Sequence, residues 1–217
     1  MTALHGALPA AAALAALVPG AAAARVTPAD ADAHVLVVGD SLAVGLAPSL
    51  ERLLGEDIAS DAKSGRTTPQ GLAALRSALQ IVRPTTVIVS LGTNDGPDPT
   101  RFTDRIDRVL AAIGPDSCVV WTNIYRPARK GPYAALNGAL GQEAARVKRL
   151  HLVGWDEAVE RRAVTLPDGL HPDPAGFAYR ARLIAHAVRA HCGLTTVGDD
   201  VPAPVGDATT GGVAAPG

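Results

Sequence analysis

The sequence predicts an α/β fold: a three-layer α/β/α sandwich built on a parallel sheet of about five strands. Three short, continuous apolar runs predict strands buried on both faces, at residues 34–38, 86–91 and 118–123. Helix-like patterns separate these runs. Because neighbouring parallel strands need a crossover connection, the alternation predicts a parallel sheet that helices cover on both faces.

Two weaker segments complete the expected sheet, a short strand at residues 58–62 and another at residues 150–153. Helices are expected where apolar residues recur every three or four positions. The expected helices cover residues 42–54, 69–79, 102–113, 133–147 and 174–191. Ligands of such sheets bind beyond the carboxyl ends of the strands, so the residues that follow each strand are the candidates for function.

Composition narrows the class of protein. The 217 residues are 47% hydrophobic and 19% charged, the balance of a single globular domain. Lys and Arg number 20 against 21 Asp and Glu, so no strong attraction to nucleic acid or to an anionic membrane is expected. Aromatic residues make up only 3%, which leaves few surfaces for stacking bases. A nucleic-acid partner is therefore not expected.

The two ends of the chain differ from its middle in amino-acid composition. Residues 7–24 are apolar and end in small side chains, which predicts a secretory signal cleaved near Ala24. Residues 1–6 contain no Lys or Arg, so an alanine-rich leader is the alternative, and Pro9 and Pro19 argue against a stable membrane helix. Residues 193–217 are rich in Gly, Pro, Thr and Ala and predict a disordered tail.

The folded domain is accordingly expected at residues 34–192. If the leader is a signal, the protein is secreted or held in the cell envelope, and otherwise it is cytoplasmic. Cys118 and Cys192 are too few for a four-cysteine zinc site. They are either two buried thiols or, in an exported protein, a disulfide between the fourth strand and the last helix.

Three residues that follow strands are candidates for a common site. Ser41 follows the first strand, and a helix beginning near Leu42 would place it where free N–H groups favour negative charge, although serine is also a common helix cap. Gly65 follows the second strand, where it is either a backbone donor to a substrate or a plain turn glycine. Asn94 follows the third strand, and its side-chain amide could donate to an oxyanion from a loop of turn-forming residues.

Asp168 and His171 lie in a proline-bounded turn before the last expected helix. Pro172 disfavours a helical conformation at His171, while Asp173 and Pro174 supply the helix cap and first residue. This turn would let the carboxylate accept a hydrogen bond from one imidazole nitrogen and leave the other free, as a general base requires. An unrelated surface Asp and His are the alternative, but all these groups fall on the ligand-binding side of the sheet.

Together the groups resemble the four sequence blocks of the SGNH (GDSL-type) hydrolases. The matching segments are residues 39–42 (Gly-Asp-Ser-Leu), Gly65, residues 92–95 (Gly-Thr-Asn-Asp) and residues 168–172 (Asp-Gly-Leu-His-Pro). They span nearly the whole expected domain. The resemblance implies a flavodoxin-like sandwich and a serine ester hydrolase that needs no metal or organic cofactor.

The resemblance also implies a role for each residue. Ser41 would attack the ester carbonyl, with His171 as general base and then general acid and Asp168 orienting it. The oxyanion hole would consist of the backbone N–H groups of Ser41 and Gly65 and the side chain of Asn94. Asp40 follows the family pattern too, and we expect it to brace the turn rather than take part in the chemistry.

The substrate class is less determined. A small core with short connections leaves little material for a lid or a deep acyl tunnel, so we expect short-chain esters, acetyl esters first, of small molecules or carbohydrates. Residues 121–127 faintly resemble a region of polysaccharide O-acetyltransferase domains, which makes acyl transfer to a cell-wall or surface polysaccharide the alternative. Those domains usually accompany a multi-helix membrane module, which this sequence does not show, so hydrolysis is favoured.

Two other classes of protein fit less well. A nucleotide-binding module would also have a glycine-containing turn between strand and helix, but residues 39–45 match neither phosphate-binding glycine pattern. A catalytically silent binding protein would not need the complete set of serine, histidine and aspartate.

Overall fold

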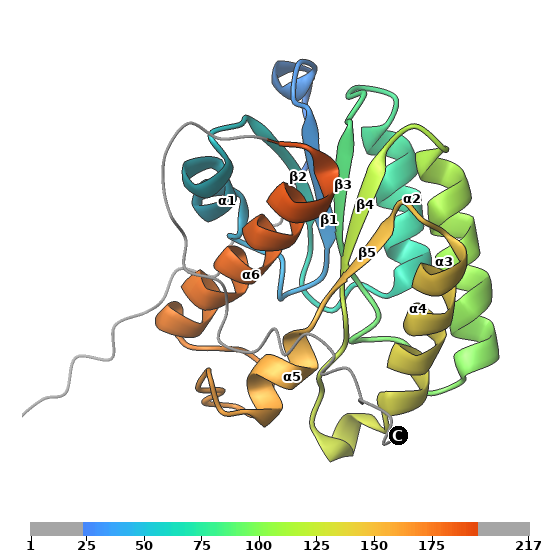
Figure 1. Ribbon diagram of the computed structural model, residues 1–217, viewed down its shortest axis with the longest axis vertical. Helices are drawn as coiled ribbons and strands as arrows, with labels where there is room; N and C mark the ends of the chain where they lie inside the picture. Colours follow the sequence, from blue (N-terminus) through green and yellow to red (C-terminus); the bar gives the residue numbers. More distant parts are fainter. Residues whose placement is uncertain (1–23, 195–217) are drawn as a thin grey trace, which may run out of the picture.

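Five parallel strands form the central sheet of the protein, whose computed structural model describes residues 24–194 (Figure 1). The strands are β1 (Val35–Gly39), β2 (Ile58–Ala62), β3 (Thr86–Ser90), β4 (Cys118–Thr122) and β5 (Leu150–Val153). Their order across the sheet is β2-β1-β3-β4-β5, and every neighbouring pair is parallel. This order is flavodoxin-like and confirms the predicted α/β sandwich.

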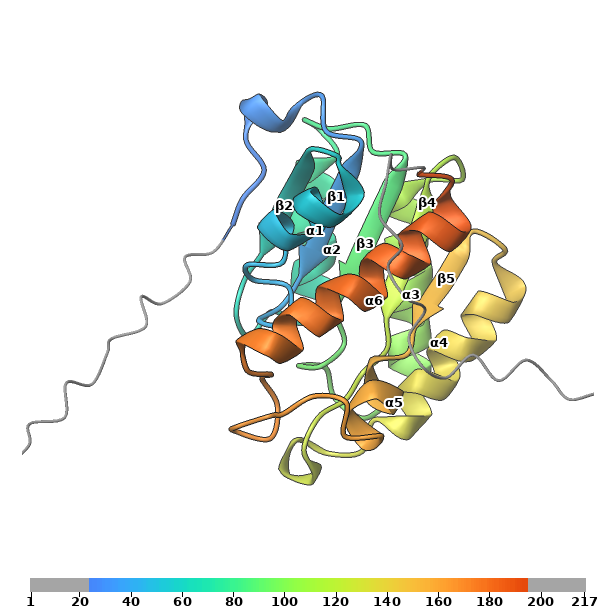
Figure 2. The ribbon, with the colours of Figure 1, turned by 60° about the vertical axis from the view of Figure 1, so that its left-hand side comes forward.

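Helices cover both faces of the sheet, as Figures 1 and 2 show. One face carries α1 (Ala47–Leu54) and α6 (Pro174–Cys192), and the other carries α2 (Thr68–Ala78), α3 (Pro99–Ile113) and α4 (Ala134–Arg146). A short helix that the sequence did not predict, α5 (Trp155–Glu160), follows β5. The alternation of strand and helix is therefore as expected through α4.

The two apolar layers explain why the strands do not alternate between apolar and polar residues. In β1, Val35 and Val37 belong to the core beneath α1 and α6, while Leu36 and Val38 belong to the core beneath α2, α3 and α4. All four are at most 1% exposed. A strand that buries both faces must be apolar at every position.

The first helix begins later than predicted. Residues 41–45 form turns, and α1 starts only at Ala47. Gly45 adopts a left-handed conformation with φ of 80°, and Pro48 lies in the first turn of α1, where its missing N–H costs nothing. The expectation that a helix begins directly after Ser41 is therefore wrong.

Ordered structure begins before the expected start of the domain at residue 34. The backbone N–H of Ala24 donates to the carbonyl of Ala62, which pairs these two residues in an antiparallel bridge. Of the predicted leader, residues 1–24, and the predicted tail, residues 193–217, only Ala24, Gly193 and Leu194 lie within the described residues. Within residues 24–194, no helix has both the length and the hydropathy needed to cross a membrane.

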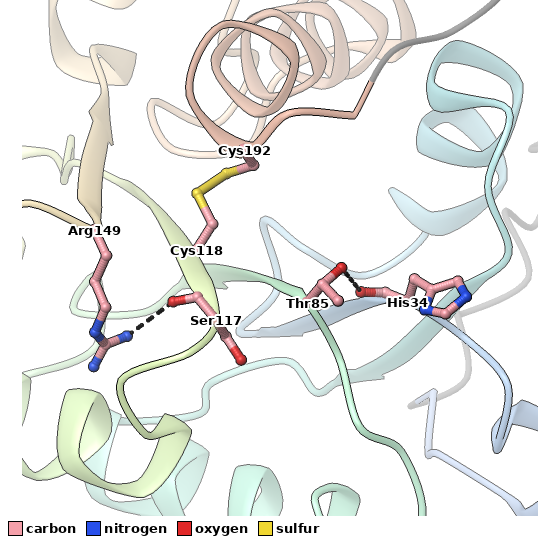
Figure 3. Close-up of a disulfide and its surroundings, with 6 residues drawn as sticks. All are labelled: His34, Thr85, Ser117, Cys118, Arg149 and Cys192. Carbon is pink, nitrogen blue, oxygen red and sulfur yellow. Dashed lines mark hydrogen bonds between the residues drawn. A yellow bond between two sulfur atoms is a disulfide. The ribbon is translucent and has the colours of Figure 1, made fainter.

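A disulfide joins Cys118, the first residue of β4, to Cys192, the last residue of α6 (Figure 3). The two Cα atoms lie 5.5 Å apart, and the bond closes a separation of 74 residues along the chain. Of the two alternatives for the cysteines, the structure has the disulfide. It fastens the C-terminus of α6 at the edge of the sheet opposite the carboxyl ends of the strands.

We expect the double substitution Cys118→Ala/Cys192→Ala to lower the free energy of unfolding by about 2 to 4 kcal/mol, because the disulfide restricts a long loop of the unfolded chain. Urea unfolding of wild type and variant measures this difference. Reducing agent should move the wild-type midpoint to that of the variant. Equal midpoints for oxidised and reduced wild type would contradict the assignment.

Candidate active site

The predicted site residues lie at the carboxyl ends of β1, β2 and β3 and in the turn that precedes α6. These loops occupy the end of the sheet at which α6 begins, at the bottom of Figure 2. Parallel strands bring the segments that follow them to the same edge, so residues distant in sequence meet there.

Ser41, His171 and Asp168 form a chain of contacts at this edge. The His171 Nε2 atom lies 2.9 Å from Ser41 Oγ, and Nδ1 of the same ring lies 2.7 Å from Asp168 Oδ2. The serine and histidine are 130 residues apart in sequence. Carboxylate, imidazole and hydroxyl thus follow one another in the order that a general base acting on a serine needs.

Local hydrogen bonds hold the Asp168 carboxylate in place. Its Oδ1 atom accepts from the backbone N–H groups of Leu170, at 2.9 Å, and His171, at 2.7 Å, which leaves Oδ2 for the imidazole. The His171 side chain and these N–H groups hold the pKa of Asp168 well below its usual range. Because an ionised carboxylate only accepts, Nδ1 carries the proton and Nε2 turns its lone pair toward Ser41.

The start of α6 fixes the position of His171. Asp173 caps the helix as predicted, since its Oδ1 accepts from the Gly176 N–H at 2.7 Å. Pro172 is buried against Gly176, where a Cβ atom would come within 2.6 Å of the proline Cβ. The turn that bears His171 therefore packs directly on the first turn of the helix.

Asp40 braces the turn that bears Ser41. It is fully buried, and its Oδ1 accepts from the Leu42 N–H at 2.9 Å, in agreement with the expected bracing role. Gly39 is required next to it, because a Cβ there would lie 2.3 Å from the Ala43 Cβ. Burial raises the pKa of Asp40 to about 6, although the Leu42 N–H and the charge of Arg180 oppose the shift.

Arg180 of α6 is the buried counter-charge to Asp40, and the sequence analysis missed it. It is 1% exposed, its Nη2 donates to Ser90 Oγ at 2.9 Å and Thr122 Oγ1 at 2.8 Å, and it stacks 4.5 Å from the centre of the Trp155 ring. Burial lowers its pKa to about 10, opposed by Asp40, so it is still a cation at neutral pH. The sequence does contain a signal for this arginine, because position 180 falls among the buried positions of α6, which recur every three or four residues.

The loops that hold Gly65 and Asn94 are joined to each other and to the end of β1. Asn94 Nδ2 donates to the backbone carbonyl of Arg66 at 3.2 Å, and Arg66 Nη1 donates to the carbonyl of Gly39 at 3.3 Å. Gly65 is exposed and left-handed, with φ of 74°, a conformation that favours glycine. Gly65 and Asn94, which were predicted to form the oxyanion hole with Ser41, thus lie in two loops that are hydrogen-bonded to each other and to the end of β1.

Arg126 holds the loop of Asn94 in place and was also missed. It is 2% exposed, and its Nη1 donates to the carbonyls of Thr93, at 3.3 Å, and Asp95, at 2.5 Å, on either side of Asn94. Its Nε and Nη2 donate to the carbonyls of residues 131–132. The sequence carries no signal for these four acceptors, because they are backbone atoms.

The fold and the contacts at its edge are those of an α/β ester hydrolase. The chain belongs to the GDSL-like lipase/acylhydrolase family, whose model matches residues 37–179. This stretch contains every residue of the predicted site, and the membership confirms the resemblance seen in the sequence. The protein is a carboxylic ester hydrolase of this family.

Individual relatives agree with this class. An arylesterase of Vibrio mimicus is 27% identical over 181 residues, which cover 74% of this chain and 90% of the relative. The solved structure of TesA superposes with a TM-score of 0.63 at 25% identity, over 72% of this chain and 98% of TesA. A family 3 carbohydrate esterase of Clostridium thermocellum shares the fold, with a TM-score of 0.61 at 22% identity over 74% and 97% of the two chains.

Burial of Asp40 predicts a pH-dependent stability. Because the pKa is raised in the folded protein, from 3.8 to about 6, the folded state binds the proton more tightly and loses stability as the pH rises between these values. A pKa shift of this size corresponds to a change of about 3 kcal/mol in the free energy of unfolding. We expect Asp40→Asn to become more stable relative to wild type by up to this amount between about pH 4 and about pH 7.

Urea unfolding of both proteins at the two pH values measures the effect. Asp104→Asn, at an exposed position of α3, is the control for the loss of one carboxylate. A difference between wild type and Asp40→Asn that is the same at both pH values would contradict the prediction.

Proposed function

We propose that the protein hydrolyses short-chain carboxylic esters, acetyl esters first, through a serine-bound acyl-enzyme. The observation that carries the proposal is the chain of contacts from Asp168 through His171 to Ser41, with 2.7 Å and 2.9 Å between successive groups. A serine hydroxyl is a weak nucleophile until a neighbouring base takes its proton, and this geometry provides that base.

The proposed reaction has two halves. In the first, His171 Nε2 takes the proton of Ser41 as Oγ bonds to the ester carbonyl carbon, and the imidazolium then gives this proton to the departing alkoxide. In the second, His171 deprotonates a water that attacks the acyl-enzyme, and the proton returns to Ser41 Oγ as the carboxylic acid leaves. Asp168 stabilises the imidazolium in both halves.

Negative charge on the carbonyl oxygen would be stabilised by the N–H groups of Ser41 and Gly65 and the amide of Asn94. One such donor is typically worth a factor of about 10² to 10³ in rate. The bond from Asn94 Nδ2 to the Arg66 carbonyl uses one amide proton and leaves the second available for the substrate. Arg126 donates hydrogen bonds to the carbonyls on both sides of Asn94, and this supports the role of Asn94, because an oxyanion donor must be held in position before the charge develops.

The lack of a regular element in the loops at this end supports small acyl groups. Residues 63–67 alone join β2 to α2, and the longer connection from β4 to α4 contains a single 3₁₀ turn, η2 (Ala128–Lys130). A small-molecule or carbohydrate ester is the proposed substrate. The disulfide between Cys118 and Cys192 supports export, since such bonds persist in oxidising compartments.

We expect Ser41→Ala to lower kcat for p-nitrophenyl acetate by at least about 10³-fold and to abolish labelling by a fluorophosphonate probe, because no other residue would form the acyl-enzyme. Ser64→Ala, an exposed serine in the neighbouring loop, is the matched control and should react like wild type. Labelling or near-normal turnover by Ser41→Ala would sink the proposal.

We also expect kcat/KM for p-nitrophenyl acetate to exceed that for the palmitate ester, because these loops supply little material for a lid or a deep acyl tunnel. Faster turnover of the palmitate ester would overturn this expectation. Acetate release with and without an acceptor sugar separates hydrolysis from transfer in the same assay. Less release of free acetate, together with formation of an acetylated sugar, would favour the acyltransferase alternative.

A further inference from the structure

We propose that the site selects esters whose alcohol part carries an anionic group, a carboxylate or a phosphate, through two cations on η2, Arg129 and Lys130. This substrate class rests on the proposed hydrolase function. Neither residue belongs to the four sequence blocks that define the predicted site.

Both side chains reach groups of the proposed machinery. Arg129 Nη2 donates to the backbone carbonyl of Asp168 at 3.1 Å, and Lys130 Nζ donates to Asn94 Oδ1 at 3.4 Å. Asp168 orients the proposed base, and Asn94 is a proposed oxyanion donor. Two consecutive residues therefore place positive charge within one hydrogen bond of both parts of the site, and both residues are exposed to an incoming substrate.

These cations lack a carboxylate partner. Their hydrogen-bond acceptors are a backbone carbonyl and an amide oxygen, and within residues 24–194 neither lies within 4.0 Å of a carboxylate oxygen. The Asp168 carboxylate instead faces His171. Within the described residues, four arginines do have a carboxylate partner: Arg66 with Asp61, Arg101 with Asp98, Arg105 with Asp95, and Arg146 with Asp107. The two cations thus remain available to a negatively charged ligand.

The loop that bears them is held in place before any substrate arrives. Arg126 Nε donates to the Gly131 carbonyl at 3.0 Å and Nη2 to the Pro132 carbonyl at 2.7 Å, directly after the two cations. Gly131 is left-handed, with φ of 87°, and ends the 3₁₀ turn. Little ordering is therefore required when an anion binds, which strengthens binding for a given set of contacts.

The expected selectivity is modest, because exposed charge pairs in water are weak and are screened by salt. We expect the two cations to raise kcat/KM for an anionic ester relative to a neutral ester by about 5- to 10-fold at low ionic strength. The acetyl ester of para-hydroxybenzoate and the acetyl ester of its methyl ester provide that pair. They share the acetyl group and the aryl ring and differ in the charge and in the leaving ability of the phenolate, and the second difference cancels when the ratio of the two kcat/KM values is compared between wild type and variant.

The experiment measures the ratio of kcat/KM for the anionic ester to kcat/KM for the neutral ester. Arg129→Gln/Lys130→Gln should lower this ratio about 5- to 10-fold, and salt should lower it in wild type. Arg129→Lys/Lys130→Arg keeps both charges and should retain the ratio. The matched control is Arg83→Gln/Lys148→Gln, which removes two exposed charges ahead of β3 and β5, at the opposite edge of the sheet, and should leave the ratio unchanged.

An unchanged ratio in Arg129→Gln/Lys130→Gln, or an equal fall in the control, would overturn the inference. Failure of the proposed function looks different, because wild type would then hydrolyse neither ester and would not react with the fluorophosphonate probe. In that case, the affinity of the Ser41→Ala variant for para-hydroxybenzoate tests the anion site without any need for turnover. The same substitutions at residues 129–130 should weaken that binding several-fold, and equal binding would reject the anion site.

Discussion

The contact between Ser41 Oγ and His171 Nε2 is the constraint that the elements around it have to satisfy. It joins residues 130 positions apart over 2.9 Å, so α6 must dock on the sheet with little freedom. The buried stripe of α6 supplies most of this docking, Pro172 packs under its first turn, and the disulfide at Cys192 fastens its far end. The packing of α6, the turn at Pro172 and the disulfide at Cys192 thus all help to hold His171 next to Ser41.

Beneath this contact, the protein buries two opposite charges. Removing Asp40 and Arg180 from water is costly, and their attraction alone does not compensate for it. The hydroxyl groups of Ser90 and Thr122 accept from Nη2 of Arg180, the ring of Trp155 lies against its guanidinium, and the Leu42 N–H binds the Asp40 carboxylate. Arg180 thus connects α6 with the ends of β3 and β4, and its charge favours the ionised form of Asp40 in the turn that bears Ser41.

The sequence was informative wherever a feature depends on neighbouring residues. The strands were predicted because burial on both faces requires continuous apolar runs, and the turn from Asp168 to His171 because its prolines act locally. The helix at Ser41 was wrong because Gly45 and Pro48 delay α1. Arg126 was missed because all four of its acceptors are backbone carbonyls, which no residue type in the sequence reveals. Arg180 was missed although its position in the buried stripe of α6 is a signal, because its polar partners come from distant strands.

The clamp by Arg126 couples two properties of the site. One guanidinium binds carbonyls on both sides of Asn94 and carbonyls directly after Arg129 and Lys130. The loops after β3 and β4 therefore share one anchor, and neither can shift without the other. Since Lys130 also donates to the amide oxygen of Asn94, it orients the same amide whose N–H would meet the oxyanion. The proposed oxyanion donor and the proposed anion site would then be linked through this buried side chain.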